Sequence, residues 1–138
     1  SGAQVRDIAA EQLSPYGRRG EERFHLSGPD VKLSPNRAVT LGMVLGELAT
    51  NAAKYGALSN GGGVEVAWTR RDEAGAPWLA LVWRERGGPE VREPTSRGFG
   101  TRLIERSVGA GLGGTATLMF EPEGVTCRID FPLLANEA

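Results

Sequence analysis

Three polar side chains of different chemistry recur along one side of a predicted helix. At about 100° per residue, Asn51 and Lys54 fall within about 40° of Glu47 around the helix axis. An amide oxygen can ligate Mg²⁺, and an ammonium group can neutralise a phosphate. A carboxylate can orient or deprotonate a nucleophile. The spacing therefore predicts one polar stripe, extended by Thr40 and edged by Tyr55, that suits a metal–phosphate group.

The rest of this helix, residues 35–55, bears on whether the stripe is functional. One broad face is apolar, and the side opposite it is apolar or small as well, with Val39, Gly42 and Met43. A helix that is apolar nearly all round is predicted to be buried, so the polar stripe is interpreted as the wall of a cleft. The alternative is a solvated strip held by a side-chain ladder worth tenths of a kcal/mol.

Glycines cluster in the second half of the chain. Of the 20 glycines, eight lie between Gly87 and Gly114. One pair follows a predicted strand, and Gly98 and Gly100 directly precede a predicted helix. Free backbone amides at a helix start favour anions, although the spacing is not that of a P-loop. The two clusters predict a nucleotide lid, and a merely mobile loop is the alternative.

The elements that position these residues follow from hydrophobic periodicity and turn signals. Ser34 and Pro35 predict a helix start, and Gly56 predicts its end. The predicted helices span 3–14, 35–55 and 100–110; the strands span 24–26, 64–68, 78–83, 115–120 and 125–133; turns or loops span 71–77, 86–97, 111–114 and 121–124. This order predicts one α+β domain over residues 1–138, a two-layer sandwich with a mixed sheet and helices on one face.

Composition excludes several classes of protein. The chain has 16 basic and 17 acidic residues, so it lacks the basic excess that is typical of a nucleic-acid binder. It contains no apolar run of about 18 residues, so no contact with a membrane is expected. The single cysteine, Cys127, excludes an internal disulfide and suits a reducing cytoplasm. Ser1 and Gly2, with no initiator Met, resemble a tag remnant, so we expect a piece of a longer protein.

Three segments together resemble the catalytic domain of sensor histidine kinases. GELATNAAKYGALS (46–59) resembles the N-box, WRERGG (83–88) the first glycine box, and RGFGTRLIERSV (97–108) the second. Their order and spacing resemble the HWE group or a close relative, because Trp83 and Glu85 are present while Gly46 stands at the His position. The resemblance covers residues 5–134. It implies the Bergerat ATP-binding fold shared with gyrase and mismatch-repair ATPases, with a mostly antiparallel sheet.

The resemblance also implies roles for individual residues. Asn51 matches the Mg²⁺ ligand, Glu47 the acidic residue that assists phosphoryl transfer, Lys54 a phosphate contact, and Tyr55 an aromatic residue beside the nucleotide. Glu85 matches the acceptor of the adenine amino group. The remaining residues implied to contact the nucleotide or its lid are Gly87, Gly88, Arg97, Gly98, Phe99, Gly100, Thr101 and, beside the adenine, Thr126.

The implied function is the catalytic domain of a cytoplasmic two-component kinase. ATP with Mg²⁺ would donate its γ-phosphoryl to a histidine on a separate dimerisation and phosphoacceptor domain, and a response regulator would then receive it. The only histidine, His25, lies in a predicted strand, so we expect no autophosphorylation of this chain alone. Two alternatives are an anti-sigma-factor-like serine kinase and a degenerate nucleotide-binding module that only binds proteins.

Overall fold

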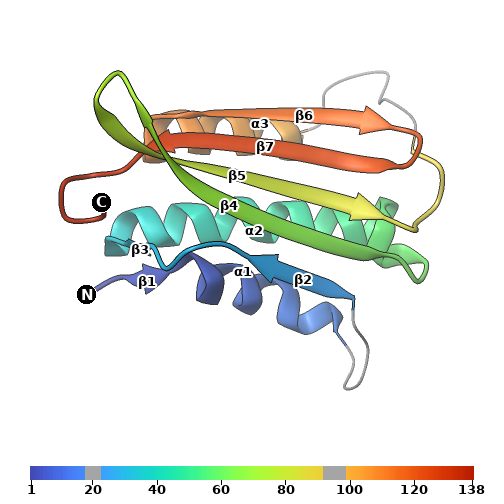
Figure 1. The fold of residues 1–138 in the computed structure, drawn as a ribbon. Coiled ribbons are helices and arrows are strands. Elements are labelled where there is room, and N and C mark those ends of the chain that lie inside the picture. The colour runs from blue at the N-terminus through green and yellow to red at the C-terminus, as the bar shows by residue number, and fades with distance from the viewer. Residues whose placement is uncertain (18–22, 92–98) are drawn as a thin grey trace.

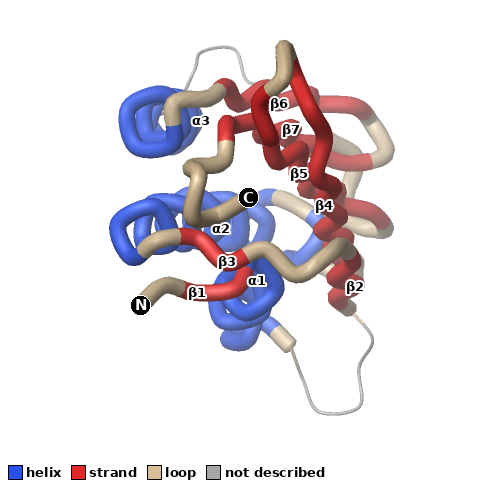
Figure 2. The backbone as a smooth tube through the Cα atoms, turned by 60° about the vertical axis from the view of Figure 1, so that its left-hand side comes forward, coloured by secondary structure: helices blue, strands red, loops and turns tan. Residues whose placement is uncertain are grey.

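A sheet covered on one face by helices forms the body of the protein (Figures 1 and 2). The computed structural model describes residues 1–17, 23–91 and 99–138. The main strands are β2 (Phe24–Ser27), β4 (Gly63–Glu73), β5 (Ala76–Arg86), β6 (Thr115–Glu121) and β7 (Gly124–Pro132). The α-helices are α1 (Val5–Leu13), α2 (Pro35–Tyr55) and α3 (Phe99–Ser107). Two short 3₁₀ helices, η1 (Ser14–Tyr16) and η2 (Ala57–Ser59), follow α1 and α2, and a short π-helix, η3 (Val108–Leu112), follows α3. The predicted α+β class is confirmed.

The sheet is mixed, as predicted. Its strand order is β2-β4-β5-β7-β6, in which β2 runs parallel to β4 and every other pairing is antiparallel. Two very short strands, β1 (Ala3–Gln4) and β3 (Lys32–Leu33), pair separately beside the start of α2. Periodicity cannot reveal two-residue strands, because they are too short to show alternation.

The core lies between the sheet and α2. Alternate residues of β4, β5 and β7 point at the helices and are almost fully buried: Val64, Val66, Trp68, Leu79, Leu81, Trp83, Cys127, Ile129 and Phe131. From α2, Leu41, Leu45 and Leu48 meet them. Burying each such side chain stabilises the fold by about 1.5–3 kcal/mol. None of the helices in the described ranges is long and apolar enough to cross a bilayer.

Three local predictions were wrong. The β4–β5 hairpin extends through the expected turn at 71–77 and reverses only at Ala74 and Gly75, because cross-strand pairing outweighs the weak local turn signals. The helix at 35–55 is not buried all round, since Val39 is 73% and Met43 48% exposed. The helical path beginning at α3 does not break at 111 but continues through η3 to Leu112.

The start of α2 is held by the C-terminal segment of the chain. Ser34 occupies the N-cap position as predicted, but its side chain does not cap the helix. Instead, the backbone N–H and the hydroxyl of Ser34 both donate to Glu137, at 2.8 and 2.6 Å. Arg37 donates to the same carboxylate at 3.1 Å and to the carbonyl oxygens of Leu112 and Pro132. A buried carboxylate therefore joins the start of α2 to the C-terminal segment.

Replacing Glu137 by glutamine is expected to lower the free energy of unfolding by about 2–3 kcal/mol at pH 7. Burial alone would raise the pKa of Glu137. The hydrogen bonds from Ser34 and Leu134 and the charge of Arg37 outweigh burial and hold that pKa below 4.5. The carboxylate therefore contributes stability above pH 4.5 that is lost as the pH falls through the lowered pKa. Urea denaturation checks this, with exposed Glu123→Gln as the control; equal midpoints for the two variants would contradict it.

Candidate functional site

The polar stripe of α2 faces the start of α3. A Cβ built on Gly100, the second residue of α3, would overlap with the carboxylate of Glu47 and lie 3.4 Å from Nδ2 of Asn51. Both side chains are partly buried. Glycine at this position therefore lets the first turn of α3 approach both polar groups of the stripe.

A second glycine allows a close approach nearer the N-terminal end of the stripe. A Cβ on Gly111 in η3 would lie 2.6 Å from Cγ2 of Thr40 and 2.9 Å from its Oγ1. The path from α3 through η3 thus runs antiparallel to α2, with glycines at both contacts. From Thr40 to Asn51 the stripe is a helix–helix boundary, which argues against the solvated-strip interpretation for these residues.

The end of the stripe is open. Lys54 is exposed, and Tyr55 is 74% exposed at the last residue of α2. Neither side chain forms a hydrogen bond or ion pair with the residues that the structure describes. An ammonium group and an aromatic ring are therefore available to a ligand at the C-terminal end of α2, beyond the point where α3 begins.

Glu85 is buried at the end of β5. It is 2% exposed, and each carboxylate oxygen accepts one hydrogen bond: Oε1 from the backbone N–H of Ala57 at 3.1 Å, and Oε2 from Nε1 of Trp83 at 3.0 Å. Gly56 makes the first bond possible, because a Cβ there would overlap with Oε1. The carboxylate therefore ties the strand to the residue that follows the end of α2.

The electrostatics of Glu85 distinguish it from a structural carboxylate such as Glu137. Within the described residues no lysine or arginine side chain forms an ion pair with Glu85. Burial raises its pKa, and the hydrogen bonds from Trp83 and Ala57 only partly oppose that effect. A buried acid without a cation is costly for the fold and is typical of functional sites.

Backbone segments crowd together beside Glu85. A Cβ on Gly88 would overlap with the Cα of Ala57, and a Cβ on Gly62 would lie 2.7 Å from the carbonyl oxygen of Ala57. Gly87 has φ +77°, a conformation that side chains disfavour. The first glycine box therefore brings three backbone segments together next to the carboxylate.

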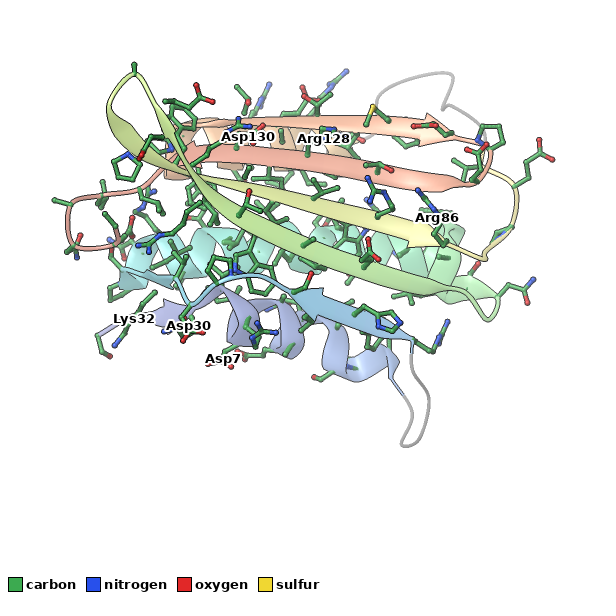
Figure 3. All side chains as sticks on the ribbon, in the orientation of Figure 1. Asp7, Asp30, Lys32, Arg86, Arg128 and Asp130 are labelled. Atoms are coloured by element: carbon green, nitrogen blue, oxygen red, sulfur yellow. The ribbon has the colours of Figure 1, made fainter. Side chains whose placement is uncertain are left out.

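Thr126 does not lie on the face of the sheet that carries Glu85. It pairs with Arg84, and residues that pair directly across antiparallel strands share a face, so Thr126 lies on the face turned away from the helices. Arg128 and Asp130, at alternate positions on β7, point to that same face in Figure 3, although Thr126 itself is only 4% exposed. Cys127 pairs with Trp83 on the helix side instead, where burial raises the pKa of its thiol to about 12.

The remaining predicted residues are less completely described. Thr101, in the first turn of α3, is partly exposed. Arg97 and Gly98 lie outside the described residues, and so does the side chain of Phe99. Gly46, at the family's His position, faces Gln12 of α1, whose Oε1 would lie 2.6 Å from a Cβ there.

Sequence reasoning missed two partners of the site. The first is Trp83, which the resemblance marks only as part of the first glycine box; its indole N–H bond to Glu85 does not follow from the sequence. The second is Gly56, which ends α2 as predicted, with φ −116°. Its role is to admit the carboxylate. The W-x-E spacing was a signal for the first contact, because residues two apart on a strand share a face.

Comparison with known proteins places these features in a family context. No family model matches the chain. It is 40% identical over 133 residues to blue-light-activated histidine kinase 1 of Erythrobacter litoralis, covering 94% of this chain and 36% of that protein. It is 36% identical to the blue-light-activated histidine kinase of Brucella ovis, covering 96% and 27%. The chain thus spans about a third of the length of these relatives.

Solved structures give the same fold. The histidine kinase domain of Erythrobacter litoralis EL346 superposes with a TM-score of 0.64 at 21% identity, covering 92% of this chain and 58% of that one. The mycobacterial sensor histidine kinase MprB gives 0.66 at 16% identity and 96% and 97% coverage. The three motifs therefore indicated the right group of proteins: this chain is a relative of the blue-light-activated histidine kinases and has the fold of histidine kinase catalytic domains.

Proposed function

We propose that this chain is the ATP-binding catalytic domain of a two-component sensor histidine kinase. It would transfer the γ-phosphoryl group of ATP to a histidine on a separate dimerisation and phosphoacceptor domain, from which a response regulator would receive it. The observation that carries the proposal is the contact of Gly100 with Glu47 and Asn51. That contact brings a helix start, which favours anions, onto a carboxylate and an amide.

The residues around this contact fit Mg²⁺ with a triphosphate. Asn51 offers a neutral oxygen ligand, which suits a cation that keeps most of its water and takes the rest of its ligands from phosphate. Lys54 is exposed at the next turn, where it can neutralise phosphate charge. Mg²⁺, when bound, offsets the charge of the phosphate oxygens and of the leaving group.

Catalysis of phosphoryl transfer requires the chain mainly to position the reacting groups and to stabilise the charge on the phosphate. Glu47 would accept the ring N–H of the incoming histidine and so orient its other nitrogen toward phosphorus. Glu85 would choose adenine, because a buried carboxylate facing the 6-amino group accepts its N–H. Tyr55, exposed at the end of α2, would lie against the nucleotide.

The test separates three outcomes. Calorimetry of this chain with ATP and Mg²⁺ should give saturable heat. Radiolabelled ATP plus a histidine-bearing acceptor domain from one of the relatives should then give an acid-labile phosphate on that domain. Acid-stable phosphate on a partner serine would replace this function with the anti-sigma-like kinase. Absence of heat would favour a module that only binds proteins.

A further inference from the structure

The tryptophan of the first glycine box is hydrogen-bonded to the carboxylate that stands two residues after it. Nε1 of Trp83 donates to Oε2 of Glu85 at 3.0 Å, and both side chains are almost completely buried. Residues two apart on a strand project to the same side, so the extended backbone of β5 holds this pair in register. The extended conformation of the strand therefore favours this hydrogen bond.

The second oxygen of the carboxylate is held independently. Oε1 accepts a hydrogen bond from the backbone N–H of Ala57 at 3.1 Å, so one donor from β5 and one from η2 each bind a different oxygen of the carboxylate. A carboxylate so held cannot rotate freely. Each oxygen has two lone pairs and uses one of them here, which leaves acceptor capacity for a further N–H.

The other tryptophans of the chain show that this arrangement is particular to Trp83. Trp68 is equally buried, but its Nε1 donates to the backbone carbonyl of Pro29 at 2.7 Å. Trp78 is partly exposed and pairs with Pro132 near the opposite end of β5. Among the described residues, Trp83 is the one tryptophan of the three that donates to a carboxylate.

We propose that Trp83 is a positioning residue for adenine recognition: its indole N–H fixes the Glu85 carboxylate in the orientation that accepts the 6-amino group of the base. This rests on the proposed function, because it assigns adenine to Glu85. Without the indole donor, the carboxylate is held at one oxygen only and spends part of its time turned away from the base. Loss of the indole N–H then weakens only those ligands that present the amino group.

The experiment compares Trp83→Phe with Trp68→Phe, since each change deletes one buried indole hydrogen bond. The probes are ATP and purine ribonucleoside triphosphate, which carries hydrogen in place of the 6-amino group, each with Mg²⁺ in calorimetry of this chain. Trp83→Phe should weaken ATP binding about tenfold relative to the analogue, the size expected for one bond to a charged group. Trp68→Phe should leave the ratio of the two affinities unchanged.

An equal loss for both ligands in Trp83→Phe, or no loss for either, would overturn the proposal. Failure of the wild-type chain to bind ATP would instead overturn the proposed function. If Trp83→Phe does not fold, the wild-type indole N–H resonance decides the matter. ATP should shift the Trp83 signal more than the analogue does, and equal shifts would refute the positioning role.

Discussion

Replacing Asn51 by alanine should abolish Mg²⁺-dependent ATP binding to this chain and lower phosphoryl transfer to a supplied acceptor domain at least about 100-fold. The change removes the amide oxygen that would ligate the cation. It spares the fold, because the side chain is only partly buried and forms no hydrogen bond with the described residues. Calorimetry with and without Mg²⁺ measures the first effect, and radiolabelled ATP measures the second.

Asn36→Ala is the matched control. It makes the same change on the first turn of the same helix, at an exposed position far along the axis from Gly100. Its ATP affinity and transfer rate should equal those of the wild type. If Asn51→Ala keeps full Mg²⁺-dependent affinity, the metal assignment fails, and the contact with Gly100 has only a packing role.

Replacing Glu85 by glutamine should lower the preference for ATP over inosine triphosphate about 100-fold. Glutamine has one acceptor oxygen where the carboxylate has two, yet Trp83 and the backbone of Ala57 both need an acceptor. Its amide NH₂ would also favour the 6-oxo group of inosine over the 6-amino group of adenine. Competition between the two nucleotides gives the ratio directly, and exposed Glu121→Gln serves as the control.

The raised pKa of Glu85 adds a dependence on pH. Burial makes the folded chain hold a proton that the unfolded chain releases above the ordinary value of 4.5. The free energy of unfolding therefore falls as the pH rises from that value through the raised pKa. ATP affinity should rise over the same interval, because only the ionised group accepts the adenine N–H. In Glu85→Gln both trends attributable to this group should vanish; their persistence would assign them to another residue.

More of the fold than of the contacts within the site could be predicted from the sequence. The bounds of α2 follow from Pro35, from its apolar face and from Gly56, all of which are local signals. The seven residues of β6 and the hairpin with β7 follow from alternation and a short turn. Local periodicity reports which way a side chain points within its own element. It does not report the residue opposite it.

The contacts that could not be predicted from the sequence lie where segments distant in the sequence meet. Thr126 and Cys127 adjoin in sequence, and only the register with β5 decides which one shares a face with Glu85. The partnership of Ser34 with Glu137 spans 103 positions, so no local pattern contains it. The crowding of Gly100 against Glu47 likewise joins two elements. A polar stripe and a glycine pair could be found separately, but their meeting required the tertiary structure.

The C-terminal segment has a practical consequence for shortened forms of this domain. Arg37 and Glu137 together link the first turn of α2 to the last carbonyl of η3 and to the end of β7. A form shortened by residues 137 and 138 would lose the carboxylate that binds Ser34 and Arg37, and Arg37 would keep only its bonds to the Leu112 and Pro132 carbonyls. Shortening the chain at a site remote from Glu85 would thereby free the arginine that binds the end of η3, the helical path whose other end lies beside Asn51.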